Sequence, residues 1–177
     1  MNHMRSQHSG EPKALTKQKE LALYQALQAA DIQFEYQKYM PFAGCGLDGE
    51  TRHAFIDFIV AQSWGYVLIE CDEDQHRSYP ASCDVRRDFD TAAAIRLGSD
   101  HTVRIIRYNP DVFRVDGRTR TVSKRDRIAR LLAVIAEEPR APFERVFLFY
   151  DQESEEASLP QVAVQWDPPV REVSRLG

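Results

Sequence analysis

Three consecutive apolar residues, Val67 to Ile69, run directly into Glu70, Cys71 and Asp72. Because neighbouring side chains of a strand point to opposite faces, an unbroken apolar run predicts a strand that is covered on both sides. We therefore expect residues 66–72 to form the central strand of a sheet with helices on both faces. No run approaches the roughly 20 apolar residues that span a bilayer. Since no signal peptide is recognised either, we expect a soluble intracellular protein of the cytoplasm or nucleus.

The patterns around this strand predict a regular series of helices and strands. Helices are expected over 16–30, 84–97 and 123–136, and strands over 32–40, 53–60, 66–72, 102–109 and 144–150. Turns are expected at Ser63-Trp64-Gly65 and at Asp116-Gly117, and a loop over 41–50. This order predicts an α/β fold with an αβββαβ core, in which helices flank a central mixed sheet.

Length and composition are those of one domain, since the chain has 177 residues of which 43% are hydrophobic. Residues 1–14 have no period and few apolar side chains, so a disordered leader is expected there. The domain should span 15–150. Residues 151–177 hold six acidic and two basic side chains and form an acidic tail, to which the segment QVAVQW could add an edge strand.

Charge is segregated along the chain, whose net charge is −4. The first 150 residues are neutral, with 21 acidic and 21 basic side chains, yet residues 101–130 hold nine Arg or Lys against three Asp. A basic stripe of this kind is what contact with nucleic-acid phosphates needs. The alternative is a solvated surface whose arginines pair with the acidic tail.

Acidic residues interrupt the two apolar strands of the predicted hairpin. Alternation places Phe55, Asp57 and Ile59 on one face of the first strand, and Leu68, Glu70 and Asp72 on one face of the second. Three crowded carboxylates repel one another, and a divalent cation is the simplest compensation. Oxygen-only ligands favour Mg²⁺ or Mn²⁺. The alternative for each single acid is a side chain that faces solvent.

The loop after the central strand holds Gln75 and His76. An imidazole titrates near neutral pH, so His76 could act as general base on an attacking water or position that water. The alternative is an exposed loop histidine.

The arrangement of these residues resembles the PD-(D/E)xK restriction-endonuclease-like superfamily. Glu20 lies on the first helix, Asp57 on the second strand, Glu70-x-Asp72 on the third with Gln75-His76 in the loop after it, and Arg86 and Arg87 on the next helix. The form IE-x-D-x-x-QH looks like the very-short-patch-repair-like branch and its uncharacterised relatives, which include proteins of large DNA viruses. The resemblance covers about residues 15–150.

The resemblance implies a role for each matched position. Asp57 and Glu70 would bind the metal, and Asp72 would be a third ligand or a partner of the metal-bound water. Gln75 and His76 would form the activating polar pair, and Glu20 would complete the site. The family's lysine, two residues after Glu70, is replaced by Asp72, so Gln75, His76 or a second metal would have to take over its role.

The implied function is that of a Mg²⁺- or Mn²⁺-dependent DNA endonuclease that hydrolyses phosphodiester bonds, either a nicking enzyme or one associated with repair or mobile elements. DNA is the expected partner, with its backbone phosphates held by arginine side chains, namely Arg86, Arg87, Arg104 and Arg107. Two alternatives remain: a catalytically inactive module of the same fold that binds nucleic acid, and an RNA-directed nuclease.

Overall fold

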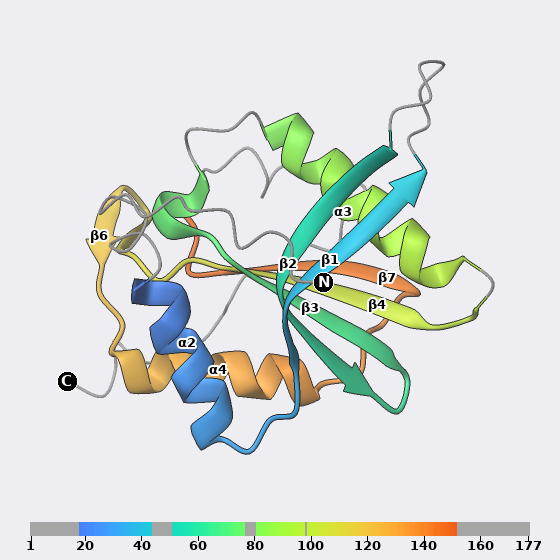
Figure 1. Ribbon diagram of the computed structural model, residues 1–177. Helices are drawn as coiled ribbons and strands as arrows, with labels where there is room; N and C mark the ends of the chain where they lie inside the picture. Colours follow the sequence, from blue (N-terminus) through green and yellow to red (C-terminus); the bar gives the residue numbers. More distant parts are fainter. Residues whose placement is uncertain (1–17, 44–50, 77–80, 98, 152–177) are drawn as a thin grey trace, which may run out of the picture.

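The computed structural model describes residues 18–43, 51–76, 81–97 and 99–151 (Figure 1). The expected leader over 1–14, nearly all of the acidic tail and the edge strand expected within that tail lie outside these ranges. None of the helices in these ranges is long and apolar enough to cross a membrane.

The core is a five-stranded mixed sheet with the strand order β1-β2-β3-β4-β7. Strands β1 and β3 both run antiparallel to β2, whereas β4 runs parallel to β3 and β7 parallel to β4. The strands are β1 (Glu35–Ala43), β2 (Thr51–Gln62), β3 (Gly65–Cys71), β4 (Thr102–Tyr108) and β7 (Phe143–Leu148). The predicted α/β fold with a central mixed sheet flanked by helices is confirmed.

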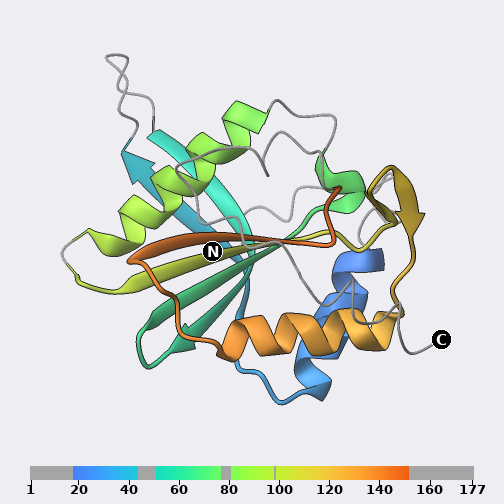
Figure 2. The ribbon, with the colours of Figure 1, turned by 180° about the vertical axis from the view of Figure 1, so that it is seen from behind.

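Helices cover both faces of this sheet (Figures 1 and 2). On one face, α2 (Gln18–Ala29) and α4 (Lys124–Ala136) bury an apolar core that includes Leu27, Leu131 and Ile135. On the opposite face, α3 (Ala81–Arg96) packs Ala92 and Ile95 against a second, smaller core. Each fully buried Leu or Ile contributes about 1.5–3 kcal/mol relative to an exposed one. The prediction that β3 is central and covered on both faces is confirmed, because Val67, Leu68 and Ile69 are all buried.

Local signals in the sequence explain several of these elements. Gly65 ends the β2–β3 turn with φ 151°, and a Cβ there would lie 2.0 Å from the carbonyl oxygen of Thr102, so only glycine fits. Asp116 and Gly117 both have positive φ and join β5 (Phe113–Val115) to β6 (Arg118–Arg120), as predicted. Ser123 caps α4 by accepting a hydrogen bond from the backbone N–H of Asp126.

The hairpin β1–β2 is longer than the sequence suggested. Residues 41–43, which we expected in a loop, continue β1, and β2 already begins at Thr51. Pro41 is tolerated because β1 is an edge strand of the sheet, where one row of N–H groups has no partner strand.

Along strand β2 of this hairpin, the buried side chains change from one face of the sheet to the other. Phe58 and Val60 pack on the α2–α4 side, whereas Ala54 and Ile56 pack on the α3 side, so the alternation of β2 breaks at Asp57. Opposite it in β1, Gln37 has a left-handed φ of 50°. The expectation that Phe55, Asp57 and Ile59 share one face is wrong, since Phe55 is half exposed and Ile59 is buried. The break places Asp57 where the hairpin changes sides.

Candidate active site

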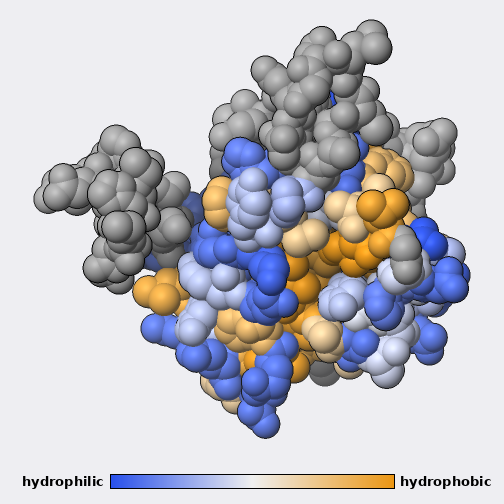
Figure 3. Space-filling model, turned by 45° about the vertical axis from the view of Figure 1, so that its right-hand side comes forward, coloured by the Kyte–Doolittle hydropathy of each residue, from blue (hydrophilic) through white to orange (hydrophobic). Residues whose placement is uncertain are grey.

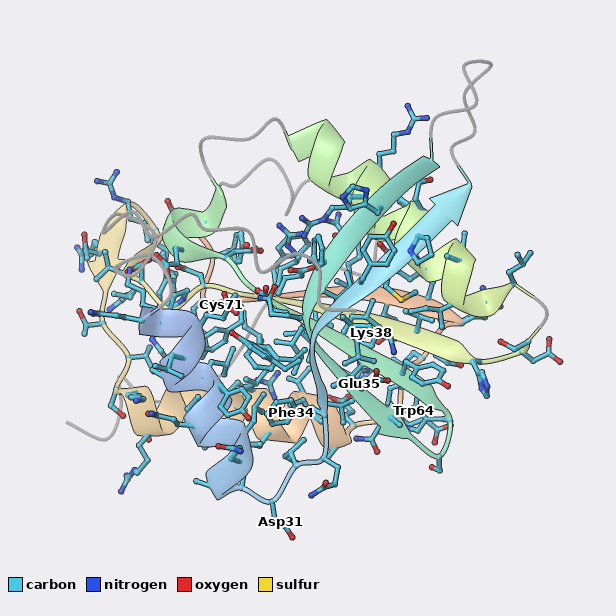
Figure 4. All side chains as sticks on the ribbon, viewed as in Figure 1. Asp31, Phe34, Glu35, Lys38, Trp64 and Cys71 are labelled. Atoms are coloured by element: carbon cyan, nitrogen blue, oxygen red, sulfur yellow. The ribbon has the colours of Figure 1, made fainter. Side chains whose placement is uncertain are left out.

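Asp57 lies where strands β2 and β3 separate. Their ladder ends at the pair Phe58 and Ile69, so the backbone of β3 beyond Ile69 has no partner in β2. The N–H of Cys71 instead donates to Oδ2 of Asp57 over 2.9 Å. Cys71, labelled in Figure 4, marks this end of β3. The carboxylate of Asp57 therefore takes the place of a ladder carbonyl, which fixes its orientation.

A polar chain connects Asp57 to helix α2. The side-chain N–H group of Gln37 donates to Oδ1 of Asp57 over 3.0 Å and to Oε1 of Glu20 over 2.6 Å. The hydroxyl of Tyr36 donates to the same Glu20 oxygen over 2.5 Å. The structure thus brings Glu20 to Asp57, as the resemblance implied, but through an intervening amide. Sequence reasoning missed Gln37, whose positive φ could not be foreseen from its residue type.

Glu70 is buried at the end of β3 and is paired with an arginine of α3. Its side chain is 6% exposed, and its Oε1 lies 2.9 Å from a terminal nitrogen of Arg87. Among the residues that the structure describes, Asp57 has no such cationic partner; its two hydrogen-bond donors are a neutral amide and a backbone N–H. Arg87 therefore contacts Glu70 directly, whereas its charge acts on Asp57 from a distance.

Both carboxyl groups hold their protons more tightly than usual. Burial raises the pKa of Asp57 to about 6; the Cys71 N–H opposes this shift, and the charges of Glu20 and Asp72 add to it. Burial also raises the pKa of Glu70 well above its ordinary value, against the opposing charge of Arg87 and with the help of the Asp57 and Asp72 charges. A positive charge placed next to Asp57 and Glu70 would favour the ionised form of both carboxyl groups.

Asp72 forms hydrogen bonds with a different set of buried residues. It is 1% exposed, and its Oδ2 accepts from Nε of Arg107 and from the hydroxyl of Tyr150, each over 2.5 Å. Arg107 also reaches Oδ1 of Asp88 over 3.2 Å, and Arg145 holds Oδ2 of Asp88 over 2.7 Å. Asp72, predicted as a third metal ligand or a partner of the metal-bound water, thus has one oxygen engaged by a buried arginine and a buried tyrosine, and its role toward a metal stays a prediction.

Two of the four arginines predicted to hold phosphates are in the core. Arg104 and Arg107 are each 1% exposed, so the prediction that they contact DNA phosphates is wrong. They lie three residues apart and hence point to opposite faces of β4. Arg104 pairs with Glu144 over 2.8 Å and donates to the carbonyl oxygens of Val134 and Glu137 under α4.

The other two arginines lie on α3. Arg87 is partly exposed and holds Glu70, whereas the side chain of Arg86 is 55% exposed and, within the described ranges, has a loose contact of 3.9 Å with Asp90. Of the basic segment 101–130, Arg127 is buried as well, with its guanidinium on the carbonyls of Asn109 and Asp111. The exposed basic side chains of that segment are Arg114, Arg118, Lys124 and Arg125.

Gln75 and His76 belong to a short 3-10 helix, η1 (Glu73–His76). The side chain of Gln75 is buried and exchanges two hydrogen bonds with Asp151, donating to Oδ1 over 3.1 Å and accepting from the backbone N–H over 2.8 Å. Gln75 thus ties η1 to the segment after β7. The position of the His76 side chain is outside what the structure describes.

The chemistry of the donors suits a hard divalent cation. Asp57 and Glu70 supply carboxylate oxygens, both have a raised pKa that added positive charge would lower, and Glu20 lies one amide away. Within the described ranges no group of three or more His, Cys, Asp or Glu side chains has the spacing of a complete metal site. The remaining ligands of a bound ion would therefore have to be water or substrate oxygens, which Mg²⁺ commonly retains.

Comparisons with known proteins give no family for the chain. No protein-family model matches it, and no curated protein matches it significantly. A solved structure described as that of a protein of unknown function, AF1548, is similar over 90% of this chain and 76% of its own, with 11% sequence identity and a TM-score of 0.34.

Proposed function

We propose that the chain is a DNA endonuclease that depends on Mg²⁺ or Mn²⁺ and belongs to the restriction-endonuclease-like superfamily. The observation that carries this proposal is the pair of acidic side chains, half-buried Asp57 and buried Glu70, at the point where the central strands separate. Acidic side chains with raised pKa values that act on one another electrostatically and lie near an arginine are typical of catalytic sites.

Asp57 and Glu70 would hold the ion. When bound, the ion would polarise a phosphate oxygen and acidify a water molecule. Gln37 and the Cys71 N–H orient the Asp57 carboxylate, so this ligand needs no rearrangement to bind. The exposed side chain of Arg86 can hold a backbone phosphate from α3.

Arg87 would supply the cation that the family places at the position of Asp72. Its guanidinium already contacts Glu70, and it is partly exposed, so it can also face an anionic phosphate. A fixed positive charge at this position stabilises negative charge that develops on phosphate oxygens during hydrolysis.

A cleavage assay with point variants tests the proposal. Supercoiled plasmid, mismatched plasmid and circular single-stranded DNA are incubated with the purified protein and Mg²⁺ or Mn²⁺. Nicked or linear product is expected from wild type, and a loss of at least 100-fold in rate from Asp57→Asn and Glu70→Gln. Glu35→Gln, which alters an exposed carboxylate of β1, is the matched control. Equal cleavage by Asp57→Asn and wild type, or no cleavage by wild type, contradicts the proposal.

A second function, nucleic-acid binding without cleavage, is favoured by one observation. Asp72 occupies the lysine position and is held by Arg107 and Tyr150, so that position supplies no catalytic cation. Titration calorimetry separates the two functions, because the endonuclease must bind Mn²⁺ with Asp57 and Glu70, whereas a binding module need not. RNA of the same sequence, placed in the same cleavage assay, tests the RNA-directed alternative.

A further inference from the structure

We propose that the cavity between the first turns of α2 and α4 binds a small organic anion, a molecule with an apolar body of about one ring and one carboxylate or phosphate group. The described residues that line this site, called the helix cavity below, include neither Asp57 nor Glu70, so the inference does not rest on DNA cleavage. Figures 1 and 2 both show the first turns of the two helices at the end of the molecule where hairpin β5–β6 lies.

Each helix contributes one face to the helix cavity. The lining residues of α2 and of α4 are spaced i, i+3 and i+4, which places them on one side of each helix. They are Lys19, Ala22 and Leu23 of α2 and Lys124, Arg127 and Ile128 of α4. The volume of the cavity is about 260 Å³, the space of roughly nine water molecules at about 30 Å³ each. A ligand of about ten non-hydrogen atoms therefore fits.

Apolar side chains form much of the wall. Leu23 and Ile128 line the helix cavity from the two helices, and Pro110 and Val122 line it from the segments after β4 and before α4. Apolar side chains also reach the surface on the face of the molecule that Figure 3 shows, but exposure alone identifies no ligand. In the helix cavity the apolar walls meet charged side chains around one small volume, which is the usual composition of a small-molecule site.

Among the described residues, the charged side chains that line the helix cavity are all cationic, namely Lys19, Lys124 and Arg127. Two acidic residues oppose them. Asp111 lies 2.5 Å from Nζ of Lys19, and the charge of Glu73 acts on Lys19 from a distance. Lys124 and Arg127 have no carboxylate partner in the part of the chain that the structure describes. The cavity thus keeps a positive charge when these acids are counted.

Two further acids in the first turns of these helices have partners elsewhere. Asp126 lies 3.6 Å from Nε of Arg125, a cation that does not line the cavity. Glu20 follows Lys19 in α2, but its Oε1 accepts from Gln37 at the active site. Neither acid therefore takes over the positive charge of the lining.

Arg127 is a buried cation that carbonyl oxygens hold. It is 5% exposed, and its guanidinium donates to the backbone oxygens of Val122 over 3.2 Å, Asn109 over 2.6 Å and Asp111 over 2.7 Å. Three of the five N–H groups of the guanidinium are thereby used, which leaves two for a ligand. These bonds also fix the wall of the cavity before a ligand arrives, which lowers the cost of binding.

The pKa of Arg127 shows how incompletely its charge is compensated. Burial lowers this pKa, although the charge of Asp111 acts in the opposite direction. Burial acts in the same way on Arg107, but there the charges of Asp72 and Asp88 outweigh it and raise the pKa well above its ordinary value. An anion in the helix cavity would give Arg127 the counter-charge that Arg107 already has.

Tyr108 adds a neutral hydrogen-bond donor. It is 4% exposed and lines the helix cavity, and its hydroxyl has no hydrogen-bond partner among the described residues. Buried tyrosine hydroxyls usually find such a partner. Burial raises the pKa of Tyr108 to about 12, against the charge of Arg127, so the hydroxyl keeps its proton at neutral pH and can donate to an anion.

Isothermal titration calorimetry of the full chain at neutral pH tests the proposal with four probes. Benzoate and phenyl phosphate carry a ring and an anionic group, benzyl alcohol carries the ring without the charge, and inorganic phosphate carries the charge without the ring. At least one of the two ring anions is expected to bind at one site, about 10-fold or more tighter than benzyl alcohol and inorganic phosphate. The tighter of benzoate and phenyl phosphate identifies the head group.

Two mild substitutions locate the bound anion. Lys124→Gln removes an exposed charge and Tyr108→Phe removes one hydroxyl, and each is expected to weaken binding of the tighter ring anion by about 3- to 10-fold. Arg125→Gln and Tyr66→Phe are the matched controls and should bind it as wild type does. Arg125 is next to Lys124 but does not line the cavity, and Tyr66 packs against the smaller core. Circular dichroism confirms that each variant is folded.

Three results would overturn the proposal. One is that neither benzoate nor phenyl phosphate binds. Another is that benzyl alcohol or inorganic phosphate binds as tightly as the ring anions, since the site would then not recognise charge and apolar body together. The third is that Lys124→Gln and Tyr108→Phe bind the ring anion as the control variants do, which would place the anion outside the helix cavity.

Discussion

A terminal nitrogen of Arg87 lies 2.9 Å from Oε1 of Glu70 and joins helix α3 to the end of the central strand. The positive charge beside Glu70 thus comes from a helix, and not from the strand position two residues later. Strand geometry sends residue 72 to the same sheet face as residue 70, but there Asp72 meets Arg107. Arg87 both contacts Glu70 and keeps 30% of its side chain exposed.

Replacement of Arg87 should therefore lower the rate of DNA cleavage without a comparable loss of stability. Arg87→Ala is expected to reduce the rate of DNA cleavage by about 100- to 1000-fold, because the charge next to Glu70 and the phosphate is lost. Arg87→Lys keeps a positive charge and should recover part of the rate. Single-turnover cleavage with saturating Mg²⁺ measures both effects.

The matched control is Arg96→Ala, which removes a basic side chain from the last turn of the same helix. Its cleavage rate should stay within twofold of wild type. If Arg87→Ala cleaves as fast as Arg96→Ala, the cation at Glu70 has no part in the reaction.

Asp72 should matter for folding and not for metal binding. Asp72→Ala removes the 2.5 Å contact that Asp72 makes with buried Arg107, and removal of one partner of a buried ion pair costs about 3–5 kcal/mol. Urea denaturation measures this loss in the free energy of unfolding. Asp72→Asn, which keeps the shape, should bind Mn²⁺ within a few-fold of wild type.

Glu73→Ala, one residue later and only partly buried, is the control and should change the free energy of unfolding by less than about 0.5 kcal/mol. A stable Asp72→Asn that has lost Mn²⁺ binding would show that Asp72 is a metal ligand after all.

The fold could be predicted because its signals are local. The apolar run Val67 to Ile69 indicated a strand covered on both sides, and Asp116-Gly117 and Ser123 marked a turn and a helix start by their own chemistry. These signals depend on residue type and period, which require no knowledge of distant neighbours. The structure agrees with them to within a few residues at the element ends.

The site was only partly predictable because its pairings are long-range. Arg104 and Arg107 looked like a basic stripe, but their partners Glu144 and Asp88 lie 40 and 19 residues away. No local pattern distinguishes a phosphate-binding arginine from one buried in an ion pair. The spacing of Arg104 and Arg107, three residues apart on one strand, was a local sign that they do not form one phosphate-binding surface, because it places the two side chains on opposite faces.

The raised pKa of Asp57 gives the stability a defined pH dependence. A carboxyl with an ordinary pKa of 3.8 and a folded-state pKa of about 6 binds its proton more tightly when folded, so stability is lost as the pH rises from about 4 to 6. Asp57→Asn removes this loss. The variant should be more stable than wild type by about 1–3 kcal/mol at pH 8 and equally stable near pH 4.

Urea denaturation of both proteins at pH 4, 6 and 8 measures this difference. Glu35→Gln, at a side chain that is 61% exposed, serves as the control and should show no such trend. A stability difference between Asp57→Asn and wild type that stays constant over this pH range would falsify the assignment of the raised pKa.

The exposed basic side chains of segment 101–130 should set the salt dependence of DNA binding. Figures 1 and 2 both show hairpin β5–β6 next to η1, which follows the end of β3 where the site lies. Arg118 is exposed on β6 of this hairpin, and Arg125 is exposed in the first turn of α4, with 92% of its side chain accessible. Each phosphate contact adds about 0.9 to the slope of log affinity against log salt for duplex DNA. Replacing both arginines by glutamine should therefore lower the slope by up to about 2.

Arg96→Gln and Arg140→Gln, also away from the core, form the control pair and should leave the slope unchanged. An equal fall for both pairs would mean that DNA responds to total charge and not to this surface.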